Sequence, residues 1–61
     1  MNGKNLMLKG DDVIVTFNNP LYYGTKGYVR EVRGCFCKVL LYISQVVLNV
    51  HVKHLKLVTY E

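Results

Sequence analysis

The sequence lacks any apolar stretch long enough to cross a membrane as a helix. Such a span needs about 18 consecutive residues with few or no charges, whereas the longest apolar run here covers only Val39 to Ile43. The first ten residues, MNGKNLMLKG, also lack the continuous hydrophobic core and the small-residue cleavage site of a signal peptide. These absences predict a cytoplasmic protein with no membrane partner.

Acidic residues are scarce. The 61 residues include 4 Asp and Glu against 8 Lys and Arg, which gives a formal net charge of +4. After Glu31 there is no further carboxylate side chain until Glu61. An excess of positive charge favours anionic partners such as nucleic acid or acidic protein surfaces, although it also serves simply to keep a small apolar domain in solution.

Cysteine is scarce as well, and the sequence offers no convincing metal site. Cys35 and Cys37 are separated by one residue, so on a strand both face the same side, which we expect to be the core. A disulfide over this separation is strained, and we therefore expect reduced thiols. His51 and His54 would complete four zinc ligands, but zinc sites usually place two to four residues between their cysteines. We predict no metal and no cofactor.

Patterns that indicate catalysis are missing. The sequence contains no Ser-His-Asp order and no paired-carboxylate pattern of the kind that general acid–base catalysis uses. Gly24 and Gly27 precede an expected strand, whereas the glycine-rich loops that bind phosphate precede helices. We therefore predict that the protein is not an enzyme and has no small-molecule substrate.

The sequence does contain a series of short segments with the pattern of β-strands. Apolar and polar residues alternate with a period of two, and turn-forming residues interrupt the alternation. A bulge is expected between Val29 and Val32, because their spacing of three breaks the alternation. Gly34 suits a hairpin turn, and residues 53–55 suit one 3₁₀ turn. The expected strands cover residues 12–17, 27–33, 35–42, 46–52 and 57–60.

Five short strands at intervals of about ten residues predict an all-β fold, a small closed antiparallel barrel. We expect a single domain over residues 1–61, with residues 1–8 as a short N-terminal arm. The predicted core consists of Val13, Val15, Val29, Val32, Val39, Leu41, Leu48, Val50 and Leu55.

Two segments, Gly10–Val15 and Gly24–Val32, resemble the KOW motif, in which a strand and a loop are followed by a glycine and the apolar start of a second strand. Residues 52–58 are similar to the short 3₁₀ turn and last strand that end the barrels carrying this motif. The resemblance covers about residues 8–59 and implies a five-stranded antiparallel SH3-like barrel. KOW proteins include ribosomal proteins and transcription elongation factors, so the resemblance implies a binding module rather than an enzyme.

One expected hairpin and the loop before it combine cations with aromatic rings. Cations bind phosphates while rings stack on bases, and this combination suits single-stranded RNA or DNA. We therefore predict that a nucleic acid or a nucleoprotein machine contacts Tyr22, Tyr23, Lys26, Tyr28, Arg30, Arg33, Phe36 and Lys38. The alternative is that Tyr28 and Phe36 cap the barrel and that the charges form an ordinary solvated face.

The alternative function is binding to protein. The expected solvent face carries the apolar side chains of Ile14, Leu40, Tyr42 and Val47. Such a surplus favours an interface. Three kinds of interface fit: a homodimer seam, an edge strand that pairs with another strand, or the dock of a small inhibitor or adaptor on a larger protein. In either function we expect at least one of Tyr22 and Tyr23 to be exposed and to contact the partner.

Overall fold

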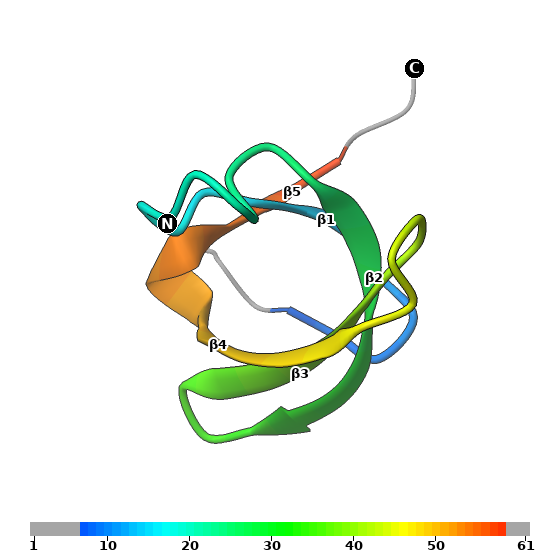
Figure 1. Ribbon diagram of the computed structural model, residues 1–61. Helices are drawn as coiled ribbons and strands as arrows, with labels where there is room; N and C mark the ends of the chain where they lie inside the picture. The colour runs from blue at the N-terminus through cyan, green and yellow to red at the C-terminus, as the bar shows by residue number, and fades with distance from the viewer. Residues whose placement is uncertain (1–6, 59–61) are drawn as a thin grey trace.

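The computed structural model describes residues 7–58, which form a five-stranded antiparallel sheet with the order β4-β3-β2-β1-β5 (Figure 1). A 3₁₀ turn, η1, joins the last two strands. The elements are β1 (Asp12–Val15), β2 (Lys26–Arg33), β3 (Phe36–Leu41), β4 (Val47–His51), η1 (Val52–His54) and β5 (Leu55–Leu57). No helix in this part of the chain is long and apolar enough to cross a membrane.

The sheet curls strongly around its core, as Figure 1 shows end-on. Its two edge strands, β4 and β5, do not pair with each other within the described residues, so the sheet is not closed by a ladder. The prediction of an all-β fold with a five-stranded antiparallel sheet is confirmed, whereas the predicted closure into a barrel is not.

The strands begin and end close to where the alternation places them. The predicted bulge is present, because the β2–β3 register shifts between Val29 and Glu31. The 3₁₀ turn precedes its expected position by one residue, and β5 begins at Leu55 rather than at residue 57. The expected continuation of the last strand through residues 59 and 60 lies outside the described residues.

The core is built from the side chains that point into the curl of the sheet. It consists of Met7, Val13, Val15, Val29, Cys37, Val39, Leu41, Val50 and Leu55. Leu48, which we expected inside, is half-buried against this cluster. Val32 was wrongly assigned to the core: it is exposed, because it lies beyond the bulge, near the tip of the β2–β3 hairpin. Met7, expected in the N-terminal arm, is instead buried.

Gly27 is required by the close approach of two strands. A Cβ atom added at this position would lie 2.4 Å from the backbone oxygen of Leu40. The residue faces Val13 on one side and Leu41 on the other, so any side chain would push β2 away from β3. The backbone does not need the left-handed conformation here, in contrast to Gly34 in the β2–β3 turn, where φ is +56°.

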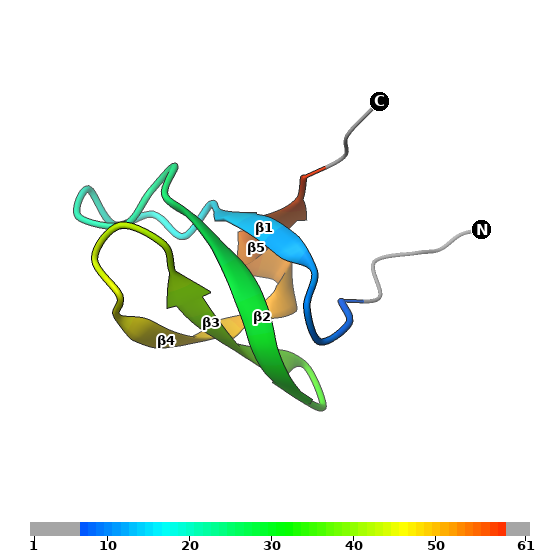
Figure 2. The same ribbon diagram turned by 90° about the vertical axis from the view of Figure 1, so that its right-hand side faces the viewer.

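The connections gather at two ends of the sheet. Figure 2 shows the loop of residues 16–25 and the loop of residues 42–46 at one end, which we call the loop end, and the β2–β3 turn at the other. Backbone hydrogen bonds tie the first loop to β1: Gly24 N–H donates to Val15 O at 2.8 Å, and Val15 N–H donates to Thr25 O at 2.9 Å.

The two cysteines differ in burial. Cys37 is buried in β3, whereas Cys35 is exposed in the β2–β3 turn. The expectation that both lie in the core is therefore wrong for Cys35, because the turn lies beyond the part of the sheet that curls around the core. Burial raises the pKa of the Cys37 thiol, which makes its reactive thiolate form less accessible.

Candidate functional site

One of the predicted contact residues, Tyr28, already contacts another ring of the same protein. Tyr28 lies on the outer face of the sheet, where its ring stacks on Tyr42 with the centroids 5.8 Å apart and the planes at 28°. The Tyr42 hydroxyl donates a hydrogen bond to Asp12. Leu40 pairs with Tyr28 across the ladder. One face of the Tyr28 ring is thus already occupied by a neighbouring ring of the same protein.

The cations of the β2–β3 hairpin surround an acidic residue. Arg33 Nε lies 2.7 Å from Glu31 Oε2, and Lys38 Nζ lies 3.8 Å from Glu31 Oε1. The hydrogen bond and the positive charge of Arg33 hold the pKa of Glu31 below its usual value. Both pairs are exposed, so they add little to stability. They do offset part of the positive charge that the sequence concentrates here. Lys26, at the start of β2, and Arg30, exposed at the bulge, form no ion pair with a described residue.

A groove with a volume of about 410 Å³ runs beside β4 and η1. We call it the ring groove, because three successive ring contacts border it. The Phe17 and His54 centroids are 5.2 Å apart, those of His54 and His51 are 6.5 Å apart, and those of His51 and Phe36 are 5.1 Å apart. Its lining consists of Phe17, Tyr22, Phe36, Leu48, Asn49, Val50, His51, Lys53 and His54.

Local backbone contacts assemble these rings. The Thr16 N–H donates to His54 O at 2.7 Å, which brings the residue after Thr16, Phe17, beside η1. His51 precedes η1, and its Nδ1 accepts from the Lys53 N–H at 3.1 Å. In a neutral imidazole this leaves the proton on Nε2. Phe36 faces His51 across the β3–β4 ladder.

The ring groove combines aromatic surface with positive charge. Lys53 is the cation among the lining residues, and none of the residues that line the groove is acidic. Of the predicted contact residues, the groove brings together Tyr22 and Phe36. Sequence reasoning did not include Phe17, His51 or His54 among the predicted contact residues. The available signal was two histidines at close spacing around a lysine.

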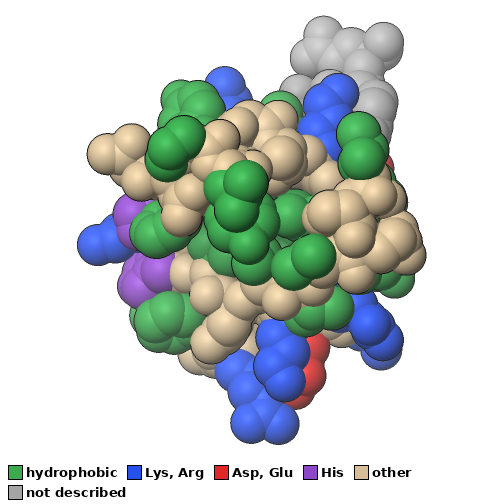
Figure 3. Space-filling view, in the orientation of Figure 1, with side chains coloured by type: hydrophobic (Ala, Val, Ile, Leu, Met, Phe, Trp, Pro, Cys, Tyr) green, Lys and Arg blue, Asp and Glu red, His purple; other side chains and the backbone are tan. Residues whose placement is uncertain are grey.

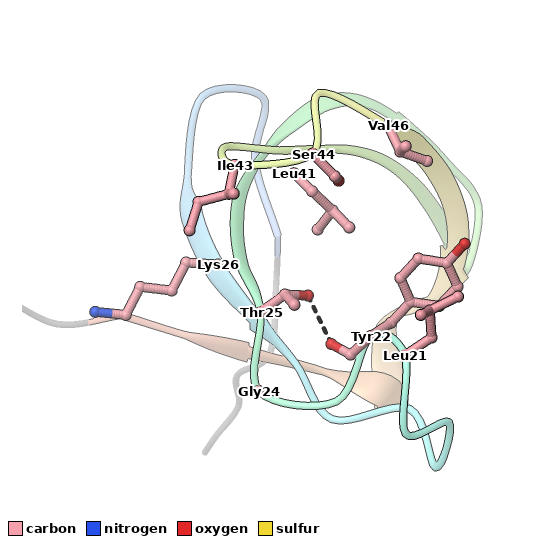
Figure 4. Close-up of a pocket in the computed structure, with 9 residues that line it drawn as sticks. All are labelled: Leu21, Tyr22, Gly24, Thr25, Lys26, Leu41, Ile43, Ser44 and Val46. Atoms are coloured by element: carbon pink, nitrogen blue, oxygen red, sulfur yellow. Dashed lines mark hydrogen bonds between the residues drawn. The ribbon is translucent and has the colours of Figure 1, made fainter.

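A second hollow, with a volume of about 590 Å³, opens at the loop end (Figure 4). Figure 4 shows Leu21 and Tyr22 on one side of it and Ile43 on the other, with Leu41 between them. Ile43 is 100% exposed. In the space-filling view, hydrophobic side chains fill the centre of this face, with histidines at its left border and cations at its lower border (Figure 3). The predicted residue Lys26 also lines this hollow.

Tyr22 and Tyr23 have different environments. Tyr23 is 63% exposed, which confirms that at least one of the two tyrosines faces solvent. Tyr22 is half-buried and packs against the core, and its carbonyl oxygen accepts a hydrogen bond from Thr25 Oγ1 at 2.6 Å. Contact of either ring with a partner stays a prediction.

The described residues contain no group of three or more His, Cys, Asp or Glu side chains that could hold a metal ion. Neither a protein-family model nor a curated protein matches the chain. The function is therefore inferred from the fold and the side chains alone.

Proposed function

We propose that the protein is a non-catalytic module that binds single-stranded nucleic acid in the ring groove. The observation that carries this proposal is the continuous series of rings from Phe17 through His54 and His51 to Phe36, beside Lys53. Aromatic side chains stack on bases and cations bind the phosphates that link them. Because every base has a π face, such a surface binds with little sequence preference.

The distribution of charge supports an anionic ligand. The whole chain carries a formal net charge of +4, and the residues that line the ring groove include Lys53 and no carboxylate. In the β2–β3 hairpin Arg33 pairs with Phe36, and Lys38 follows Phe36 by two residues, although Glu31 partly neutralises both cations. A nucleic acid in the groove would therefore meet favourable charge at both η1 and the hairpin.

The proposal includes an SH3-like barrel of the KOW type that works within a nucleoprotein machine. It is supported by the strand order β4-β3-β2-β1-β5, the strong curl of the sheet and the 3₁₀ turn before β5. Gly27 packs so closely against the backbone of β3 that only glycine fits there, which explains why the motif has a glycine at this position. A cytoplasmic location is also part of the proposal, in agreement with the free thiols of Cys35 and Cys37.

The test is fluorescence anisotropy with labelled poly(U) and poly(dT) oligonucleotides. Binding at low salt should weaken steeply as salt is added, because the release of counterions from the phosphates favours association less at higher salt concentration. The double variant F17L/F36L keeps apolar side chains but removes two rings. It should bind roughly 5- to 150-fold more weakly for each base that loses its ring, since one stacked base contributes about 1–3 kcal/mol.

The control for this experiment is I43A, which removes a side chain that is 100% exposed and lies outside the ring groove. This variant should bind as tightly as the unmodified protein. The absence of any binding at low salt would overturn the proposal, and so would equal losses in I43A and F17L/F36L.

Binding to a protein is the second candidate function, and the loop end favours it. Leu21 and Ile43 are exposed there and line the 590 Å³ hollow, and Tyr23 is exposed in the same loop as Leu21. Exposed apolar clusters of this kind mark interaction sites. This function predicts no oligonucleotide binding at low salt, and a protein partner whose capture is lost in the variant L21S/I43S.

A further inference from the structure

β4 is an edge strand with one unpaired side. The Leu41 N–H donates to Val46 O at 2.9 Å and the Val52 N–H donates to Cys35 O at 2.8 Å. Since hydrogen-bonded pairs alternate along an antiparallel ladder, residues 46, 48, 50 and 52 point their backbone groups toward β3. The N–H and C=O groups of residues 47, 49 and 51 therefore point away from the sheet, and those of residues 47 and 49 bond no other described residue. The C=O of His51 is the N-cap carbonyl of η1, which accepts the first bond of that turn and keeps a second lone pair.

This edge lacks the features that usually prevent pairing. Exposed edge strands commonly carry charged residues or proline, which block the approach of another strand. β4 reads VLNVH and contains no Lys, Arg, Asp, Glu or Pro. The opposite edge strand, β5, has only three residues, with Lys56 at its centre. Of the two edges, β4 is thus the one that accepts a further strand.

We propose that two copies of the protein associate by antiparallel pairing of β4 with β4, about a two-fold axis at Asn49. In this register Asn49 lies opposite Asn49 of the partner subunit, and Val47 lies opposite His51 of the partner subunit. Every outward N–H and C=O group of these three residues then meets a partner. The two sheets become one continuous sheet across the seam.

The side chains at the seam favour a second copy over an unrelated strand. Val47 is 46% exposed and would lie against the ring of His51 of the partner subunit. Within each chain His51 contacts Phe36, which is 45% exposed. Each end of the seam would thus cover exposed apolar surface. Like charges directly opposite each other would destabilise the pairing, and the proposed register contains none. In such a pairing, β4 of each copy supplies hydrogen-bonding partners to the unpaired edge of β4 in the other copy.

The dimer and the nucleic-acid complex would be alternatives. His51 and Phe36 lie at the seam and also line the ring groove, so pairing of β4 restricts access to the groove. The two states also respond oppositely to salt. Two chains of charge +4 repel each other, and salt screens this repulsion, so dimerisation should strengthen in the range of salt where oligonucleotide binding weakens.

The experiment is sedimentation velocity over a range of protein concentrations without nucleic acid, so its outcome does not depend on the proposed function. A reducing agent prevents crosslinking through the exposed Cys35. The unmodified protein should change from monomer to dimer as its concentration rises. The variant N49P removes an N–H that points away from β3, so the intramolecular ladder is retained, and it should remain monomeric.

Two further variants protect the test against a failure of N49P to fold. V47K adds a charge on the unpaired edge and should raise the dimer dissociation constant at least tenfold. Y23K adds the same charge at an exposed position of the loop end and should dimerise like the unmodified protein. A protein that is monomeric at all concentrations overturns the proposal. A dimer that persists in V47K, or one that Y23K weakens equally, overturns it as well.

Discussion

Replacing Gly27 by alanine tests the most constrained contact of the fold. The added Cβ would lie 2.4 Å from Leu40 O, 3.0 Å from the carbonyl carbon of Leu40 and 3.0 Å from the Cα of Leu41. All three atoms belong to the backbone of β3. A side chain in this place could turn away by changing its rotamer, but a backbone inside a ladder moves only if the strands separate.

The size of the effect follows from this geometry. Overpacking a well-filled site costs about 1–3 kcal/mol, and we expect the upper end, about 3 kcal/mol, because the obstacle is backbone. For a domain of this size each kcal/mol lowers the melting temperature by about 4–8 °C, so G27A should melt roughly 12–24 °C below the unmodified protein. A domain of this length has a total free energy of unfolding of roughly 3–9 kcal/mol, so the variant is expected to be only marginally folded.

The assay is thermal unfolding followed by circular dichroism, with Gly24 as the matched control. An added Cβ at Gly24 meets no atom within 4 Å, but the backbone there has φ of +84°. G24A should therefore lose only about 1 kcal/mol, and G24N should recover part of that loss because asparagine tolerates the left-handed conformation. A melting temperature of G27A within a few degrees of the unmodified protein, or above that of G24A, would refute the steric explanation.

The remaining predictions concern single side chains. Y22A should lose roughly 1–2 kcal/mol in thermal melts because the ring is half-buried on the core, whereas Y23A should melt like the unmodified protein; equal losses would contradict their different burial. In the native protein iodoacetamide should alkylate exposed Cys35 and spare buried Cys37, as mass spectrometry of the labelled chain reports; equal labelling would contradict this. NMR titration should give Glu31 a pKa below its usual value of 4.5. The contribution of its ion pairs to stability should therefore be complete above pH 4.5 and should decline as the pH falls through the lowered pKa of the folded protein. A raised pKa would argue against the ion pairs.

The strands could be predicted because burial imposes a period of two on a half-buried sheet. Val13 and Val15 follow this rule, and both are buried. The rule fails at the tip of the β2–β3 hairpin, where Val32 and Cys35 are exposed although the alternation places them inside. The same alternation no longer indicates burial there, because the tip extends beyond the part of the sheet that curls around the core.

The ring groove could not be predicted in the same way, because it joins segments that are far apart in the sequence. Phe17 reaches His54 through one backbone hydrogen bond of its neighbour Thr16, and such a bond leaves no periodic trace in the sequence. Tyr22 and Phe36 were identified from their residue type alone. Their shared place in the groove depends on the path of the first loop, which composition does not determine.

The bulge in β2 has a consequence for how the length of this chain could vary between related proteins. Val29 pairs with Val39 and Glu31 pairs with Lys38, so the ladder passes over Arg30. A chain without this residue would keep both pairings, and each remaining side chain of the hairpin would stay on its present face. Loss of Val29 or Glu31 instead would bring Arg30 into the ladder. Position 30 is therefore where a deletion of one residue is structurally neutral, and we expect relatives with a one-residue shorter hairpin to have lost the arginine.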